Sequence, residues 1–473
     1  MAKKIGQYAA ALRYVHLPES VVQEVKNRTL DLIGVSLPAW REKPAQILIS
    51  YALKIEGNAD ASILLHKTRV PAATAALVNG TMGHCLEIDD DHNQLVGHPG
   101  VTAIPACLAA AEKAGTSGRE YIVSVVLAYQ LTCSLGQAIT SGTLHDQGWH
   151  PTGICGTFGA ALGAAKALNL DTDQIVCALG IAGSQTSGLF EYQTDGTWTK
   201  RLHGGWSAHN GVLAAILAKG GLTGPASVLE GRFGFLHAFA KRGNYDPQLL
   251  ERAFFSGLYE IEKTSYKPYA CCRDTHPGID VTLDVIEANE IEPTSIKSIQ
   301  IFLHQEALPI VASPAERRYR PQTTVDAQFS IYYAVAAAIL SRERRETMTT
   351  FLAQFTEEMI KDQGILDLAA RITCTADLEL NAMFPEFYGA KVELTTYDGK
   401  IYKHFRQAHR GDQSIGAEKF SYTQLEQRFM SLTESVLERE QAKKAVETID
   451  RLENLDSLTE FMRMLSVPKK GGR

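Results

Sequence analysis

The stretch GWHPTGICGTFGAALGAAKALNL, residues 148–170, is typical of a tightly packed helix in an all-helical core. Pro151 suits the first turn of a helix, because its missing N–H would have no partner there. Four glycines follow at steps of three or four residues, at Gly153, Gly156, Gly159 and Gly163. No predicted strand precedes them and their spacing is not that of a phosphate-binding loop, so they predict close contact between helices.

Helical segments of similar composition lie on both sides of this stretch. Apolar residues recur at helical spacing after Ser20, which we expect to cap a helix, and Asp171 is a second expected cap. Up to about residue 250, further predicted helices span residues 71–86, 101–114, 121–135, 171–184 and 208–218. After residue 413 the pattern is helical again, at residues 422–437, 440–452 and 457–465.

The pattern between about residues 259 and 413 is mixed. Ser295–His304 alternates apolar and polar side chains, which is the periodicity of a strand. Asp398-Gly399 predicts a type I′ hairpin turn, because this pair readily adopts positive φ. Further strands are predicted at residues 372–380 and 392–394, and helices at residues 278–288 and 325–340.

These patterns predict a mainly α protein with two domains. One is a large all-helical domain built from both ends of the chain, residues 1–262 and 414–473. The other is a smaller α+β domain inserted between them, residues 263–413.

Composition excludes several classes of function. The chain has 473 residues, 45% of them hydrophobic and 21% charged, and a formal net charge of −6. The charge gives no reason to expect nucleic acid or an anionic membrane as a partner. The apolar run Tyr332–Leu340 is too short to span a bilayer, and the N-terminus lacks the apolar region of a secretion signal. We therefore expect a cytoplasmic protein.

Eight cysteines occur, and none of them forms a C-x-x-C pair. This spacing gives no support for a zinc ribbon or an iron–sulfur cluster. We expect reduced thiols that pack as small apolar residues.

The first polar cluster is EIDDDHNQLVGHPG, residues 87–100, between two predicted helices. Asp89, Asp90 and Asp91 together with His98 suggest either a metal site or an acid–base site. The DDxxD pattern of magnesium-binding sites is incomplete, since Asn93 and Gln94 occupy the positions where an aspartate is needed. A structural role is the alternative, in which the aspartates cap the following helix.

A second cluster, residues 148–153, repeats the His-Pro arrangement at His150. The positive end of a helix lowers the basicity of an imidazole and attracts anions, so a neutral histidine there can take a proton from carbon. A lone histidine is more often a satisfied structural residue. Two His-Pro pairs, each at the start of an Ala/Gly-rich helix, favour function.

Two further clusters are basic. DGTWTKRLHGGW, residues 195–206, places Lys200 and Arg201 in a predicted loop among tryptophans and glycines, which favours a carboxylate clamp over a solvated face. YKPYACCRDTHPG, residues 266–278, adds Lys267 at the domain junction, along with Arg273, Cys271, Cys272 and His276. A Cys–His nucleophile is disfavoured, since nothing around it resembles a known setting of that kind.

Taken together, the clusters supply cations for anionic groups and histidines for proton transfer, with no metal or cofactor motif. This combination predicts cofactor-free proton chemistry next to carboxylates, which means elimination, decarboxylation or epimerisation.

Five motifs, in this order, resemble those of the MmgE/PrpD family: IDDDH…HPG, GWHPTGICGTFGAALGAAKALNL, DGTWTKRLHGGW, VLEGRFGF and KPYACC…THPG. Members of that family include 2-methylcitrate dehydratase, cis-aconitate decarboxylase and iminodisuccinate epimerase. The resemblance implies a helical domain from both chain ends, a smaller α+β lid and a homodimer.

The resemblance also implies site residues. It places His98, His150, Lys200 and Lys267 at the active site, and Tyr333 matches the family's lid tyrosine. The candidate substrate-binding residues are Asp89, Asp90, Arg201, Cys272 and His276.

The chain departs from the family pattern at two positions. Asp91 stands where the family usually has threonine, and Cys272 stands where animal cis-aconitate decarboxylases have histidine. Three hypotheses follow: a cofactor-independent and metal-free lyase on a small di- or tricarboxylate, an epimerase of an iminodisuccinate-like compound that uses two bases, or a catalytically silent helical binding protein.

Overall fold

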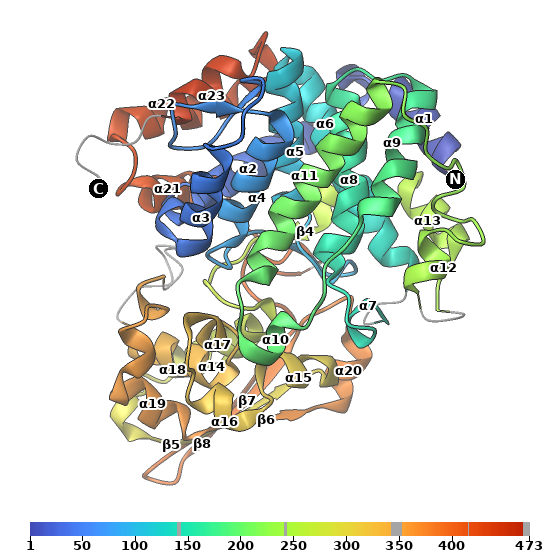
Figure 1. Ribbon diagram of the computed structural model, residues 1–473. Helices are drawn as coiled ribbons and strands as arrows, with labels where there is room; N and C mark the ends of the chain where they lie inside the picture. Colours follow the sequence, from blue (N-terminus) through green and yellow to red (C-terminus); the bar gives the residue numbers. More distant parts are fainter. Residues whose placement is uncertain (140–142, 241–243, 342–351, 415, 467–473) are drawn as a thin grey trace.

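The structure is a computed structural model that describes residues 1–473 except 140–142, 241–243, 342–351, 415 and 467–473. It is mainly α, as predicted. A large helical body lies above a smaller part that holds a four-stranded sheet (Figure 1).

The helical body is built from long, buried helices. Its N-terminal segments are α1 (Ala2–Ala11), α2 (Glu19–Ser36), α3 (Lys43–Ala52), α4 (Ala72–His84), α5 (Gly100–Ala114), α6 (Gly118–Ala138), α7 (Thr143–Asp146), α8 (Pro151–Ala167), α9 (Thr172–Gln185), α10 (Tyr192–Asp195), α11 (Thr199–Lys219), α12 (Phe235–Phe239) and α13 (Pro247–Phe254). The C-terminal helices return to this body beside α2 and α3 (Figure 1), as α21 (Tyr422–Thr433), α22 (Arg439–Asp450) and α23 (Thr459–Leu465). One buried apolar core contains residues from both chain ends.

The predicted close contacts between helices are confirmed. A Cβ at Gly159 of α8 would collide with Thr132 and Ala128 of α6. Gly80 of α4 and Gly205 of α11 meet backbone to backbone in the same way. Glycine is needed at these positions because any side chain would push the helices apart.

The α+β part has its own apolar core. Its sheet has the strand order β6 (Ile372–Ala376), β5 (Ile296–Leu303), β7 (Ala390–Thr396), β8 (Ile401–Arg406). The β5–β6 pair is parallel and the other two pairs are antiparallel. The helices of this part are α14 (His276–Ala288), α15 (Leu308–Val311), α16 (Ala315–Tyr319), α17 (Thr324–Gln328), α18 (Ile331–Leu340), α19 (Gln363–Ala369) and α20 (Leu378–Met383).

Short ladders tie the loops together around the site. In the ladder of β3 (Asp91–His92) with β4 (Thr264–Ser265), Asp91 lies opposite Ser265. The aspartate-rich loop therefore runs beside the segment that leads to Lys267. A second small ladder joins β1 (Ala61–Ser62) to β2 (Arg69–Val70).

Several local predictions are wrong. The N-cap of α2 is Pro18, not Ser20. The helix predicted at residues 325–340 is broken at Phe329-Ser330, where the Ser330 side chain caps α18. Residues 378–380 begin α20, because Asp377 caps that helix after the strand ends.

The turn at residues 397–400 joins β7 to β8 as predicted, but its type is not I′. Gly399 has φ +86°, whereas Asp398 is not among the residues with positive φ. The Asp398 carboxylate accepts hydrogen bonds from Thr396 Oγ1 and Lys400 N, which holds the residue in an ordinary conformation.

All eight cysteines are free thiols, as predicted. One described helix, α6, is long and apolar enough to cross a membrane, but 94% of its most apolar window is buried inside the protein. That burial fits the core helix of a soluble protein.

Candidate active site

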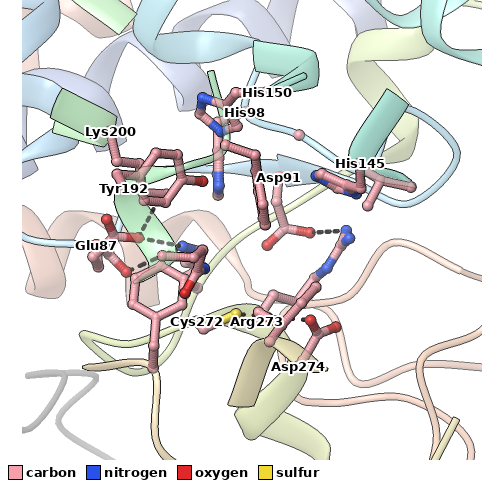
Figure 2. A pocket seen from close by; sticks show the side chains of 17 residues that line it. Glu87, Asp91, His98, His145, His150, Tyr192, Lys200, Cys272, Arg273 and Asp274 are labelled. Atoms are coloured by element: carbon pink, nitrogen blue, oxygen red, sulfur yellow. Dashed lines mark hydrogen bonds and ion pairs between the residues drawn. The ribbon is translucent and has the colours of Figure 1, made fainter. Parts of the chain in front are cut away.

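A pocket lies where the helical body faces the α+β part (Figure 2). The helical body contributes the loop from Glu87 to His98, the start of α8 and the segment from Phe190 to Lys200. The α+β side contributes Lys267–Asp274, Ile310 and Phe329. Chain segments that are far apart in the sequence thus meet around one cavity.

His98 points into this pocket with a defined tautomer (Figure 2). Its Nδ1 lies 2.8 Å from the backbone oxygen of Asp90, and because a carbonyl can only accept, Nδ1 carries the proton. The other ring nitrogen, Nε2, is therefore the basic atom. Burial lowers the pKa of His98 well below 6.5, and the charges of Lys267 and Lys200 lower it further. A neutral imidazole at pH 7 can act as a general base.

His150 lies next to His98 at the N-terminus of α8, and the two ring centroids are 6.4 Å apart. Its Nδ1 is 3.0 Å from Nδ1 of His203, so one of these rings donates and the other accepts. Burial lowers the pKa of His150 well below 6.5, and His203 adds to this effect. Two neutral imidazoles therefore face one cavity.

Two lysines share one buried carboxylate beside these histidines. Glu87 Oε2 lies 2.5 Å from Lys200 Nζ and 3.7 Å from Lys267 Nζ, and Lys267 also donates to the Glu87 backbone oxygen. Burial alone would raise the pKa of Glu87, but the two ammonium groups lower it to about 2. The pKa of Lys200 is lowered by burial. Burial also acts on Lys267, but Glu87, Asp89 and Asp91 outweigh it and raise the pKa of that lysine.

This trio has two positive charges against one negative charge. The surplus positive charge faces the cavity and can bind a substrate carboxylate. The two neutral histidines in the same cavity can then add a proton to the neighbouring carbon or remove one from it.

Arg273 forms a second ion pair in the pocket. Its Nη1 donates to Asp91 Oδ1 at 2.6 Å, and its guanidinium stacks on Tyr388 with 3.7 Å between Cζ and the ring centroid. This pair lies across the cavity from Lys200 (Figure 2).

Comparison with known sequence families gives two matches that together cover most of the chain. A sequence model of the MmgE/PrpD N-terminal domain matches residues 3–248, and one of the MmgE/PrpD C-terminal domain matches residues 269–454. The chain belongs to the MmgE/PrpD family.

Curated relatives of this MmgE/PrpD protein cover nearly its whole length. A cis-aconitate decarboxylase of Aspergillus terreus is 25% identical over 487 aligned residues, which cover 99% of this chain and 96% of that protein. A cis-aconitate decarboxylase-like protein of Aspergillus oryzae is 25% identical, with 98% and 96% covered. The cis-aconitate decarboxylase of Homo sapiens is 24% identical, with 97% and 92% covered. These similarities support a lyase-type activity.

The structure brings together half of the ten candidate site residues that the sequence singled out. His98, His150, Lys200, Lys267 and Cys272 all line the pocket. Burial raises the pKa of the Cys272 thiol, so it lines this MmgE/PrpD site as a neutral group and not as a thiolate.

Other predicted residues lie behind the pocket or away from it. Asp89 supports His98 from behind, and Asp90 accepts hydrogen bonds from Gly100 N and Tyr129 Oη. His276 is buried with its Nε2 on the Cys271 carbonyl, and Tyr333 donates to the Gln354 carbonyl. Their catalytic or binding roles stay predictions.

Arg201 faces a different cavity from Lys200. The two residues lie in the first turn of α11, not in a loop as predicted, and consecutive positions of a helix point in different directions. Arg201 is 3.4 Å from Glu42 and donates to Gln328 in a second cavity, which Arg41 and Lys43 also line.

Sequence reasoning missed Glu87, His84, His145 and Tyr192. Glu87 is 113 residues from Lys200 and 180 from Lys267, so no local spacing reveals the trio. The available signal was an acidic residue two positions before the aspartate run.

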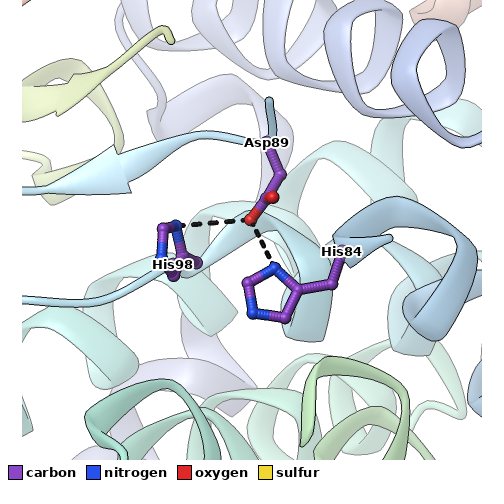
Figure 3. A group of neighbouring side chains, drawn as sticks. All are labelled: His84, Asp89 and His98. Carbon is purple, nitrogen blue, oxygen red and sulfur yellow. Dashed lines mark hydrogen bonds and ion pairs between the residues drawn. The ribbon is translucent and has the colours of Figure 1, made fainter. Parts of the chain in front are cut away.

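His84, Asp89 and His98 could together offer ligands to a metal ion (Figure 3). Asp89 Oδ2 lies 2.9 Å from His84 Nδ1 and 3.3 Å from His98 Nδ1. Nδ1 of His98 would have to give up its bond to the Asp90 carbonyl to bind an ion. The geometry therefore fits an aspartate that orients His98 better than it fits a metal ligand. That the reaction needs no metal stays a prediction.

Proposed function

We propose that this protein is a cofactor-independent lyase that acts on a small di- or tricarboxylate. The observation that carries the proposal is the free Nε2 of a neutral His98 beside the Lys200–Glu87–Lys267 trio. The similarity to cis-aconitate decarboxylases supports the same class of reaction.

In this proposal, a substrate carboxylate binds at the lysines. Lys267 remains the charged anchor, since its pKa is raised by the surrounding carboxylates despite burial. His98 moves a proton at the carbon next to that carboxylate, and Asp89 holds the His98 ring in position. His150 stands 6.4 Å away, ring to ring, as the second acid or base.

An epimerase is the second candidate. Two neutral histidines at one cavity are also what two-base proton transfer at a Cα–H requires. The lyase is favoured because the curated relatives reported above are decarboxylases or decarboxylase-like proteins.

Proton NMR in heavy water tests the proposal, with 2-methylcitrate, citrate, cis-aconitate and iminodisuccinate offered in turn. Dehydration or release of carbon dioxide would support the lyase. Deuterium wash-in without net change would support the epimerase. No reaction with any of these substrates would contradict both the lyase and the epimerase. It would instead support a catalytically silent binding protein.

We also propose that residues 263–413 act as a lid that closes on the substrate. The pocket takes Glu87 and His98 from one part of the chain and Arg273 from the other, so a ligand that contacts both would bind the closed form preferentially. Closure would exclude water and strengthen each contact between a lysine and a carboxylate.

Activity should persist into mildly acidic solution. His98 must be unprotonated to act as a base, and burial lowers its pKa well below 6.5. We therefore expect the acid limb of kcat/KM to fall below pH 6.5, after correction for the separately measured ionisation of the substrate. An acid limb at pH 7 or above would contradict a neutral His98 base.

A further inference from the structure

One buried carboxylate oxygen in the pocket has no partner among the residues that the structure describes. Asp91 is 1% exposed, and its Oδ1 binds Arg273 while its Oδ2 accepts no hydrogen bond. The β3–β4 ladder fixes the Asp91 backbone, and the carboxylate points into the cavity beside His98 and Arg273 (Figure 2). A buried acceptor without a donor is costly, so this atom indicates where a donor on a ligand fits.

Arg273 is already occupied by protein groups. Nη1 donates to Asp91 and, at 3.2 Å, to Asn93 Oδ1, while Nη2 donates to Tyr388 Oη. The guanidinium also stacks on the Tyr388 ring. Three of its five N–H groups are therefore engaged by protein groups, and its charge is already paired with Asp91.

The charges of the pocket lead to the same conclusion. Its positive side chains are Lys200, Lys267 and Arg273, and its negative ones are Glu87, Asp91 and Asp274. These balance, since the lining histidines are neutral at pH 7. Among the lining residues that the structure describes, the local surplus of positive charge is at the two lysines. The Asp91 side attracts a hydrogen-bond donor and repels a carboxylate.

We propose that Asp91 is a specificity residue that accepts a hydrogen bond from a hydroxyl or N–H group of the substrate. The substrate class is then a hydroxy- or nitrogen-substituted carboxylate. An unsaturated tricarboxylate such as cis-aconitate, which has no donor when ionised, is disfavoured. This inference rests on the proposed function, because it takes the pocket as the substrate site.

Calorimetric binding of matched ligand pairs to the full-length protein tests the inference without any turnover. Malate and aspartate differ from succinate by one hydroxyl or one ammonium group, and citrate differs from propane-1,2,3-tricarboxylate by one hydroxyl. We expect the donor-bearing member of at least one pair to bind roughly 10- to 100-fold tighter, the usual worth of a hydrogen bond to a charged group. Malate against aspartate distinguishes the hydroxyl from the nitrogen donor.

Variants at Asp91 test whether this residue causes the preference for donor-bearing ligands. Asp91→Ala should abolish the preference and strengthen binding of propane-1,2,3-tricarboxylate, because Arg273 is released. Asp91→Asn keeps the shape and should reduce the preference to a few-fold. Asp274→Asn is the matched control at another lining carboxylate and should keep the preference.

Equal binding within every pair by the unmodified protein would overturn the inference, and so would a full preference in Asp91→Asn. If all ligands bind alike but turnover depends on His98, the proposed function stands and only this inference fails. If no carboxylate binds at all, the proposed function itself fails.

Discussion

Replacement of His98 by alanine should lower turnover by roughly 10²–10⁴, the usual worth of a positioned acid or base. Its Nε2 is the one ring atom left to act on a substrate, because Nδ1 is committed to the Asp90 carbonyl. His150→Ala should give a loss of similar size if it acts as the partner acid or base. Steady-state kinetics on the substrate identified by NMR measures both effects.

Folding should survive these changes, since His98 lies at the cavity and its removal leaves Asp89 paired with His84. His404→Ala, on the exposed strand β8, is the control and should leave turnover unchanged. Loss of thermal stability in parallel with activity would mark His98 as structural. Full activity in His98→Ala would show that it is not the base.

Glu87→Gln should be the most destabilising single change in the pocket. It would leave two buried ammonium groups without their shared carboxylate, and breaking a buried ion pair typically costs about 3–5 kcal/mol. Urea unfolding at pH 7 measures the free energy of unfolding. The double variant Glu87→Gln/Lys200→Met should recover much of the stability and none of the activity, because it removes one unpaired charge together with a site lysine.

The pH dependence of this contribution has a defined sign. The pKa of Glu87 is lowered to about 2 in the folded protein, against 4.5 ordinarily. Its stabilisation is therefore present above about pH 4.5 and is lost as the pH falls toward 2.

A surface pair serves as the control for Glu87→Gln. Glu440 and Lys443 are exposed and 3.0 Å apart, so Glu440→Gln should cost less than about 1 kcal/mol. Equal stability of Glu87→Gln and the unmodified protein would contradict the buried trio.

The helices were most predictable where their ends carry chemical signals. The predicted end of α5 matches the observed one, and α8 and α9 begin at the residues that Pro151 and Asp171 indicated. The start of α11 was missed, because Trp198 precedes it and its second turn is His203-Gly204-Gly205-Trp206. The glycines there serve close packing on α4, and only the folded protein shows this.

The site was predictable residue by residue but not pair by pair. Histidines and lysines in short motifs could be singled out, and four of the five catalytic candidates line the pocket. Tyr333 does not line the pocket, and its hydroxyl donates to the Gln354 carbonyl. The Glu87 trio and the Asp91–Arg273 pair join residues more than 100 positions apart, so no sequence spacing could reveal them.

Hydrogen exchange with and without a saturating carboxylate ligand tests the central claim most directly. We expect slower exchange both in the loop from Glu87 to His98 and around Lys267–Arg273, because one bound ligand contacts both parts of the chain. The second cavity, at Arg41 and Arg201, also carries cations and is the internal comparison. Unchanged exchange around Lys267, or protection confined to the second cavity, would contradict an active site formed between the two parts.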